Sequence, residues 1–269
     1  MEHNTLLESY KNIVTKFLDK NIVTKFLDKI EDEQFQDLVT RGLVISKNKA
    51  KQPILLLSGI NPSFNDKEND RQDVLFTFAE AKDHGRSKYW GKKHNQFGGK
   101  YSKLVQENMA YLDLFPLKET KQLRFERVLR PYNDFRMELL VETQKEIEKI
   151  NPKLIVHANK TSLYYWGLNP ITYTKDSVNT WMNYDFEEIN FRDCPPLIKY
   201  SQRVDTFNVP KEKRFVHFYK ISGNGFVDGN HYFLAYVMEY YGMKDWQKVQ
   251  LLTPIEMTEL WEWCKKNKI

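Results

Sequence analysis

The chain has 269 residues, of which 41% are hydrophobic and 29% are charged, with a formal net charge of +5. This length is enough for one large α/β domain with a real core, and the mild positive charge suits nucleic acid as well as many cytosolic enzymes. Two distant cysteines, Cys194 and Cys264, without a CxxC pattern, disfavour a disulfide framework or a zinc site. No apolar run reaches transmembrane length and no signal-peptide core is present, so we expect a soluble protein in the cytoplasm or on the nucleoid.

Residues 1–45 are predicted to form an N-terminal helical segment that contains a perfect tandem repeat. Lys11–Asp19 and Lys20–Asp28 both read KNIVTKFLD. A nine-residue shift rotates an α-helix by about 900°, so the apolar stripes of the two copies lie on opposite sides. One straight helix cannot bury both stripes against one core. We therefore expect the helix to break near Asp19, or the second stripe to meet something else. A duplication tolerated at a terminus is the simpler interpretation.

The segment from Ile54 to Phe64 carries the clearest functional motif. Its first four residues are apolar and suit a fully buried strand, which we expect over residues 53–58. Gly59 allows a sharp turn at the carboxyl end of this strand, and Asn61-Pro62 fixes the turn with one amide at the tip. Ligands bind at such tips in parallel α/β sheets. On the motif alone, an ordinary strand-to-loop turn is an equal alternative.

Residues 82–103 are rich in cations and aromatic rings. Cations neutralise phosphates and rings stack on bases, so the segment predicts a nucleic-acid surface that includes Lys88, Lys92 and Lys93. The alternative is a solvated basic loop whose aromatic rings turn into the core.

Further elements follow in an α/β order. Helical spacing over residues 138–150 stops at Asn151-Pro152, and a short helix opens at Asn159 and could end at Gly167. Residues 168–212 read as an irregular insertion, and 221–230 as a glycine-rich loop. The other predicted elements are strands near 109–114, 153–158 and 213–217, and helices over 230–241 and 254–266.

The strand-and-turn motif Gly59-Ile-Asn-Pro62 resembles the first active-site motif of the uracil-DNA glycosylase superfamily. It is most similar to the mismatch-specific and single-strand-selective monofunctional branches. Met109–Leu117 looks like the second strand of that family, with Asp113 at the place of a base-reading Asn. Lys153–Ala158 looks like the third strand. Arg214–His217 looks like the fourth, although Phe-Tyr follows the histidine where the family has Pro-Ser. The resemblance covers roughly residues 50–240.

This resemblance implies a three-layer α/β/α fold with a central four-stranded parallel sheet in residues 46–269. It implies a monofunctional DNA glycosylase that flips a damaged or modified base out of single- or double-stranded DNA and hydrolyses its N-glycosidic bond during base excision repair. We expect no membrane partner. We also expect no metal and no cofactor, because the four cysteines of the family's iron–sulfur branch are absent.

The resemblance also implies roles for single residues. His217 would donate to the leaving base and Asn61 would orient the attacking water through its amide oxygen, although an amide is a poor general base. The base would lie against Gly59, Ile60, Phe64 and Asp113, and the glycine-rich loop would enter the DNA through Ser222, Asn224 and Phe226.

Two other classes stay open. One is a catalytically weak or inactive protein of the glycosylase fold that binds nucleic acid, which the departures at Asp113 and after His217 favour. The other is an unrelated doubly wound enzyme acting on a nucleotide, for which no glycine-rich phosphate motif is present. His157, on the third predicted strand, is a rival to His217 but fits a packing role better.

Overall fold

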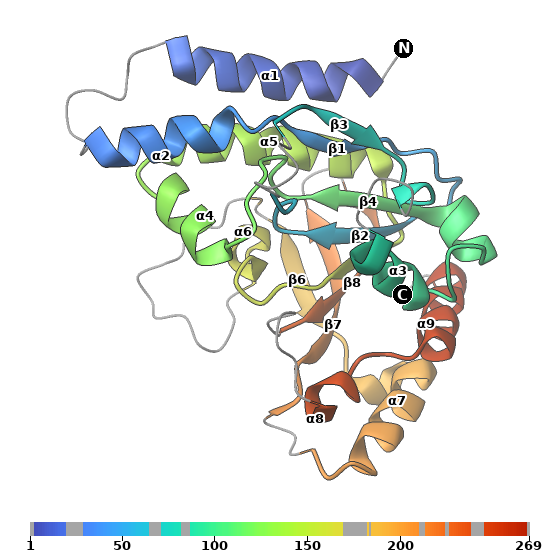
Figure 1. Ribbon diagram of the computed structural model, residues 1–269. Coiled ribbons are helices and arrows are strands. Elements are labelled where there is room, and N and C mark those ends of the chain that lie inside the picture. The colour runs from blue at the N-terminus through green and yellow to red at the C-terminus, as the bar shows by residue number, and fades with distance from the viewer. Residues whose placement is uncertain are drawn as a thin grey trace. The chain divides into compact units, whose positions relative to one another are not determined.

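A mostly parallel β-sheet flanked by helices forms the centre of this mixed α/β protein (Figure 1). The computed structural model describes residues 3–19, 29–64, 71–81, 87–168, 182, 184–209, 213–223, 226–237 and 245–267. The chain divides into two compact units that alternate along the sequence. Unit 1 comprises Met1–Lys47, Gly59–Phe76 and Leu112–Lys149, and unit 2 comprises Asn48–Ser58, Thr77–Tyr111 and Ile150–Ile269.

The main sheet has six strands in the order β4-β2-β5-β8-β7-β6. Strands β2 (Leu55–Gly59), β5 (Leu154–His157) and β8 (Phe226–Tyr236) pair in parallel. Strand β7 (Val216–Gly223) runs antiparallel to β8, and β6 (Asp185–Glu188) runs antiparallel to β7. Strand β4 (Met109–Asp113) lies at the edge beside β2. β5 is buried along its whole length, as its apolar run predicts for a central strand.

The register aligns one row of residues across four strands of unit 2. Ser58 pairs with His157, His157 with Ala235, and Ala235 with His217. Because β2, β5 and β8 are parallel, this row lies at the carboxyl edge of those strands. Paired residues share one face of a sheet, so Ser58, His157 and His217 belong to the same face.

Three of the four predicted strands are confirmed near their expected positions, and the fourth is wrong. Residues 216–223 form an antiparallel strand, and the strand that continues the parallel order is β8. The predicted helix over 230–241 and the predicted loop over 221–230 are therefore corrected, since Phe226–Tyr236 is a strand. A short apolar run such as Tyr232–Tyr236 does not distinguish helix from strand by periodicity.

Helices of unit 2 pack on both sides of its sheet. On one face, Phe218 and Tyr232 contact Trp263 of α9 (Pro254–Lys266), the helix expected over these residues. On the other face, Trp166 of α6 (Leu163–Trp166) contacts Phe233. Gly167, with φ 98°, ends α6 as predicted. The expected irregular insertion over residues 168–212 contains the helix α7 (Pro195–Asp205). Residues 169–181, 183 and 210–212 of this insertion lie outside the described part of the chain. The other helical elements of unit 2 are α3 (Ser87–Asn95), a π-helical turn (Leu104–Asn108), a 3₁₀ turn (Phe191–Asp193) and α8 (Asp245–Lys248).

Unit 1 is built from helices around an aromatic core. Phe35 stacks on Tyr132 at 3.8 Å between ring centroids and meets Phe135 edge-on at 5.1 Å. The elements are α1 (His3–Asp19), α2 (Lys29–Val39), a parallel pair of strands β1 (Val44–Ser46) and β3 (Val74–Phe76), α4 (Gln122–Leu129) and α5 (Asn133–Ile150).

Helix α1 contains the first copy of the nonapeptide repeat, and its described residues reach Asp19. Tyr10 and Ile13 of its predicted apolar stripe are buried. The second copy, Lys20–Asp28, lies outside the described residues. Among the helices that are described, none is long and apolar enough to cross a membrane.

Candidate functional site

In unit 1, the loop after β2 runs alongside the loop after β4. The backbone N–H of Leu114 donates to Gly59 O at 3.0 Å, and that of Phe115 donates to Ile60 O at 2.9 Å. Farther along, the N–H of Glu119 donates to Pro62 O at 2.8 Å. The turn that the Gly59–Pro62 motif predicts is therefore stabilised by the neighbouring loop.

Asn61 is fixed by its amide nitrogen. Nδ2 donates to the backbone oxygens of Glu119 at 2.7 Å, Pro62 at 3.0 Å and Leu117 at 3.4 Å. Three carbonyl oxygens around one amide atom identify that atom as the nitrogen, so Oδ1 must face the other way. Among the described residues no donor bonds to Oδ1, and the half-buried side chain presents a fixed acceptor at the tip of β2.

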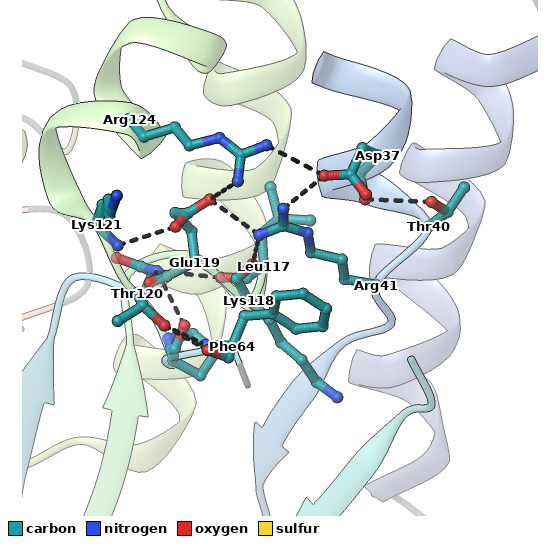
Figure 2. Close-up of polar contacts among 12 residues, drawn as sticks. Asp37, Thr40, Arg41, Phe64, Leu117, Lys118, Glu119, Thr120, Lys121 and Arg124 are labelled. Atoms are coloured by element: carbon teal, nitrogen blue, oxygen red, sulfur yellow. Dashed lines mark hydrogen bonds and ion pairs between the residues drawn. The ribbon is translucent and has the colours of Figure 1, made fainter. Parts of the chain in front are cut away.

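A charged cluster supports this loop (Figure 2). Glu119 accepts from Arg41 Nη1 at 2.9 Å and from Arg124 Nη1 at 3.0 Å, and its other oxygen accepts from the N–H of Lys121 at 2.9 Å. Arg41 and Glu119 are both buried. An ion pair removed from water needs several partners to offset its desolvation, and this pair has them.

Asp37 on α2 completes the cluster. It accepts from Arg41 Nη2 at 2.5 Å, Arg71 Nη2 at 2.8 Å and Arg124 Nη2 at 3.2 Å. Burial opposes ionisation of Asp37, but the hydrogen bonds from Arg71 and Arg41 outweigh it and lower the pKa of this carboxyl to about 2. The carboxylate therefore stays charged across the physiological range and holds three guanidinium groups together.

Phe64 packs against cations rather than standing free. The guanidinium carbon of Arg41 lies 4.2 Å from its ring centroid, and that of Arg71 lies 5.6 Å away. The ring therefore already has a guanidinium partner, which leaves less of its surface for the base stacking expected of it.

The other base-binding candidates are buried. Ile60 lies in the core, and Asp113, the last residue of β4, is only 7% exposed. Gly59 ends β2 and serves the turn. Asp113 can read a base only if the base reaches a side chain that the fold nearly encloses.

In unit 2, His217 lies at the expected edge of the sheet, but near the start of its strand and not at the end. It lies near the start of an antiparallel strand, so its position at the carboxyl edge of β5 and β8 comes from the reversed direction of β7. Its Nδ1 lies 3.2 Å from Oε1 of Glu188, and its side chain is 24% exposed. The ring is nearly parallel to that of Tyr219, whose pKa is raised to about 12, first by burial and then by the Glu188 charge. His217 is thus a half-exposed imidazole oriented by a carboxylate.

His157 and Ser162 form a pair that looks catalytic but is not arranged for nucleophilic attack. Nε2 of His157 lies 2.8 Å from Oγ of Ser162. The indole N–H of Trp166, which can only donate, points to Nδ1 of His157 at 3.2 Å. Nδ1 is therefore the acceptor and Nε2 carries the proton. The histidine donates to the serine and cannot act as its base.

The cluster of His157 and Ser162 is fully buried. His157 and Ser162 have no exposed surface, and Ser162 in turn donates to Oδ1 of Asn159 at 3.1 Å. Burial, assisted by the charge of Lys93, lowers the pKa of His157 to about 3. The packing role expected of His157 agrees with this neutral, enclosed state.

The basic segment and the glycine-rich loop only partly match the predicted DNA surface. Lys92 is exposed near the end of α3, but Lys93 is 4% exposed and cannot contact a phosphate at the surface, which corrects its assignment. Phe226 is buried against Tyr184 and His231, so it is not available as a wedge. Ser222 is half-buried. The side chain of Lys88 and the residue Asn224 lie outside the described part of the chain.

Sequence reasoning missed the charged cluster. The i, i+4 spacing of Asp37 and Arg41 on a helical segment is a usable signal for one of its ion pairs. The meeting of Glu119 with Arg41, which are far apart in the chain, has no such signal.

No family model matches the chain, no curated protein matches it, and no solved structure matches it. Function is therefore inferred from the residues and their geometry alone.

Proposed function

We propose that this protein is a monofunctional DNA N-glycosylase, which hydrolyses the bond between deoxyribose and a damaged or modified base flipped out of DNA. The observation that carries the proposal is the geometry of Asn61, whose amide nitrogen is held by three carbonyls while no donor among the described residues bonds to Oδ1. The proposal includes a glycosylase-like core in which β4, β2, β5 and β8 form the parallel part of the sheet.

The chemistry needs three functions. The base must leave the stack, the departing base must be stabilised as it gains negative charge, and water must meet an oxocarbenium-like sugar. Oδ1 of Asn61 accepts a hydrogen bond from the attacking water and so orients its oxygen toward C1′. An amide does not deprotonate water, so this enzyme relies on stabilising the leaving base.

The family resemblance assigns that stabilisation to His217, a residue of unit 2. Nδ1–H of His217 donates a hydrogen bond to Glu188, and in the imidazolium form of the ring Nε2–H donates to the departing base. The water oxygen bonds to C1′, and the C1′–N bond breaks with its electron pair passing to the base. The base takes up the Nε2 proton of His217, and the proton that the attacking water loses passes to solvent, from which the imidazole is reprotonated. Glu188 favours this geometry because its carboxylate fixes the ring and balances the imidazolium charge.

The test is a base panel on single-stranded and duplex oligonucleotides carrying uracil, hypoxanthine or modified cytosines. The variant His217→Ala should lower turnover by roughly two to three orders of magnitude, as loss of an oxyanion donor does elsewhere, while DNA affinity hardly changes. Tyr219→Phe, which keeps the neighbouring ring, is the matched control and should stay close to wild type.

Equal excision by the wild type and His217→Ala would remove His217 from the reaction. Absence of excision from every oligonucleotide, with DNA binding intact, would overturn the glycosylase and favour a nucleic-acid-binding protein of the same fold.

A further inference from the structure

Helix α4 exposes a cationic face. Leu123, Arg127 and Arg130 follow an i, i+4, i+7 spacing, which places them on one side of a helix. Phe125, Val128 and Leu129 occupy the opposite side and are buried. Arg127 and Arg130 are exposed, and Leu123 beside them is 84% exposed. The apolar side of α4 is thus used by the core of unit 1, and the cationic side faces solvent.

Among the described residues, nothing neutralises the cations on this face. Within the described part of the chain, neither guanidinium of Arg127 and Arg130 nor the ammonium of Lys121 forms an ion pair. Arg124, on the flank of the same helix, differs because Glu119 and Asp37 bind it. The acid within the helix, Glu126, has one carboxylate oxygen buried, which limits its use as a surface counter-charge.

The positive charge at the start of α4 does not stabilise the helix through its dipole. A helix dipole favours acids in the first turn and cations in the last, each worth about 0.3–1 kcal/mol. The first turn of α4 has no acidic residue, and Lys121 stands at its N-cap. Arg127 and Arg130 suit the helix end, but the cation at the start does not.

We propose that this face of α4, formed by Lys121, Leu123, Arg127 and Arg130, binds the phosphate backbone of DNA. The inference rests on the proposed function and deepens it. Arg side chains bind phosphate through paired N–H groups, and an exposed leucine beside them can pack against sugars. α4 belongs to the same unit as Asn61, and Arg124–Glu119–Asn61 is a continuous chain of hydrogen bonds from this helix to the motif loop. Phosphates held on α4 would therefore be held relative to Asn61.

An anionic membrane is a poorer match for this surface. Helices that lie on membranes bury a broad apolar face in the lipid. The apolar side of α4 is already buried in its own unit, and Leu123 is the one apolar side chain among the described residues of the cationic face. A polyanion that needs charge and little apolar area fits better.

The experiment measures binding to a 20-nucleotide single strand and to the matching duplex over a range of salt concentrations. The variant Lys121→Gln/Arg127→Gln/Arg130→Gln should bind more weakly and with a shallower slope of log affinity against log salt. Each lost phosphate contact reduces the slope by about 0.9 on duplex and about 0.7 on a single strand, so we expect a reduction of about 2 to 3. The matched control is Lys149→Gln/Arg192→Gln/Lys266→Gln, which removes the same charge from exposed positions elsewhere and should leave the slope unchanged.

Thermal melting of both variants checks that each remains folded. An unchanged slope in a folded α4 variant, or equal effects of the two triple variants, overturns the interface even if bases are excised. Binding to phosphatidylserine vesicles with no binding to DNA overturns it in favour of a membrane. A shallower salt dependence of DNA binding in the α4 variant, but not in the control variant, supports the interface. If the wild-type protein shows this salt dependence but excises no base, the glycosylase is rejected and the DNA interface stands.

Discussion

The tips of β2 and β5 are both rich in polar side chains, yet they are in opposite states. At the tip of β5, His157 uses both ring nitrogens, and Asn159 and Ser162 bond to each other inside the core. At the tip of β2, Asn61 bonds to other described residues only through its nitrogen, and the cluster beside the loop includes the partly exposed side chains of Arg124 and Asp37. The first cluster joins a strand to a helix. The second has an acceptor available for a ligand.

The difference shows that residue type and distance are not enough to identify a reactive site. A Ser–His separation of 2.8 Å would suit a nucleophile and its base. The third partner decides otherwise, because the indole of Trp166 can only donate and so sets the tautomer. A complete account of donors and acceptors separates the two clusters where the sequence does not.

The sharpest test compares Asn61→Ala with Ser162→Ala in the excision assay. Loss of the water-orienting oxygen should lower turnover by about 10²-fold or more, in the range of acid–base and positioning groups. Ser162→Ala should leave turnover unchanged because Ser162 is enclosed. The reverse order of effects would mean that the β5 cluster is the catalytic one.

A second test concerns stability. In Asn61→Asp, a carboxylate oxygen replaces the donor that faces three carbonyl oxygens, so the free energy of unfolding should fall by more than in Ser162→Ala. Leaving buried partners unsatisfied costs about 1–3 kcal/mol, and more when a charge is involved. Urea denaturation of both variants measures the difference, and an Asn61→Asp variant as stable as wild type would show that the amide assignment is wrong.

A third test uses acid. The pKa of His157 is about 3 in the fold against an ordinary value of 6.5, so only the unfolded chain takes up this proton between those values. Stability is therefore complete above about pH 6.5 and falls as the pH drops toward 3. His157→Gln should be less stable than wild type at pH 7 but should lose less stability between pH 6.5 and 4. Melting temperatures of the wild type and of His157→Gln, measured between pH 7 and 2, check this. If both proteins lose the same stability between pH 6.5 and 4, His157 is not the titrating group in that window.

Asp37 acts at lower pH. Because its pKa is near 2, its contribution to stability disappears only between about pH 4 and 2.

The smallest expected effect is on base preference. Asp113, when ionised, offers only acceptors, so it fits bases that present N–H or amino donors better than uracil. Asp113→Asn should shift the relative excision rates toward uracil by a few-fold, since the side chain is nearly enclosed. A wild type that prefers uracil strongly, with the same preference in the variant, would leave Asp113 a structural role.

The sequence predicts those parts of the molecule that depend on local patterns. The buried runs of β2 and β5, the glycine that ends α6 and the helix over residues 254–266 all depend on local patterns. The direction of β7 depends on its hairpin with β8, so a strand ending at His217 and one beginning there look alike in sequence. The contact of Glu119 with Arg41 and the burial of Lys93 likewise depend on packing between distant segments.

The alternation of the two units along the chain has a consequence for how the protein is made. Strands β2 and β4 each begin in unit 2 and end in unit 1, so neither unit corresponds to a continuous piece of chain. On the ribosome, unit 1 lacks its last helix, α5, until about residue 149 has emerged. Strand β8, which pairs with β5, is synthesised much later. Folding during synthesis cannot therefore proceed one unit at a time, and contacts of such long sequence separation form slowly. Because neither unit is continuous, a fragment truncated near residue 150 should yield aggregation-prone chains with unpaired strand edges.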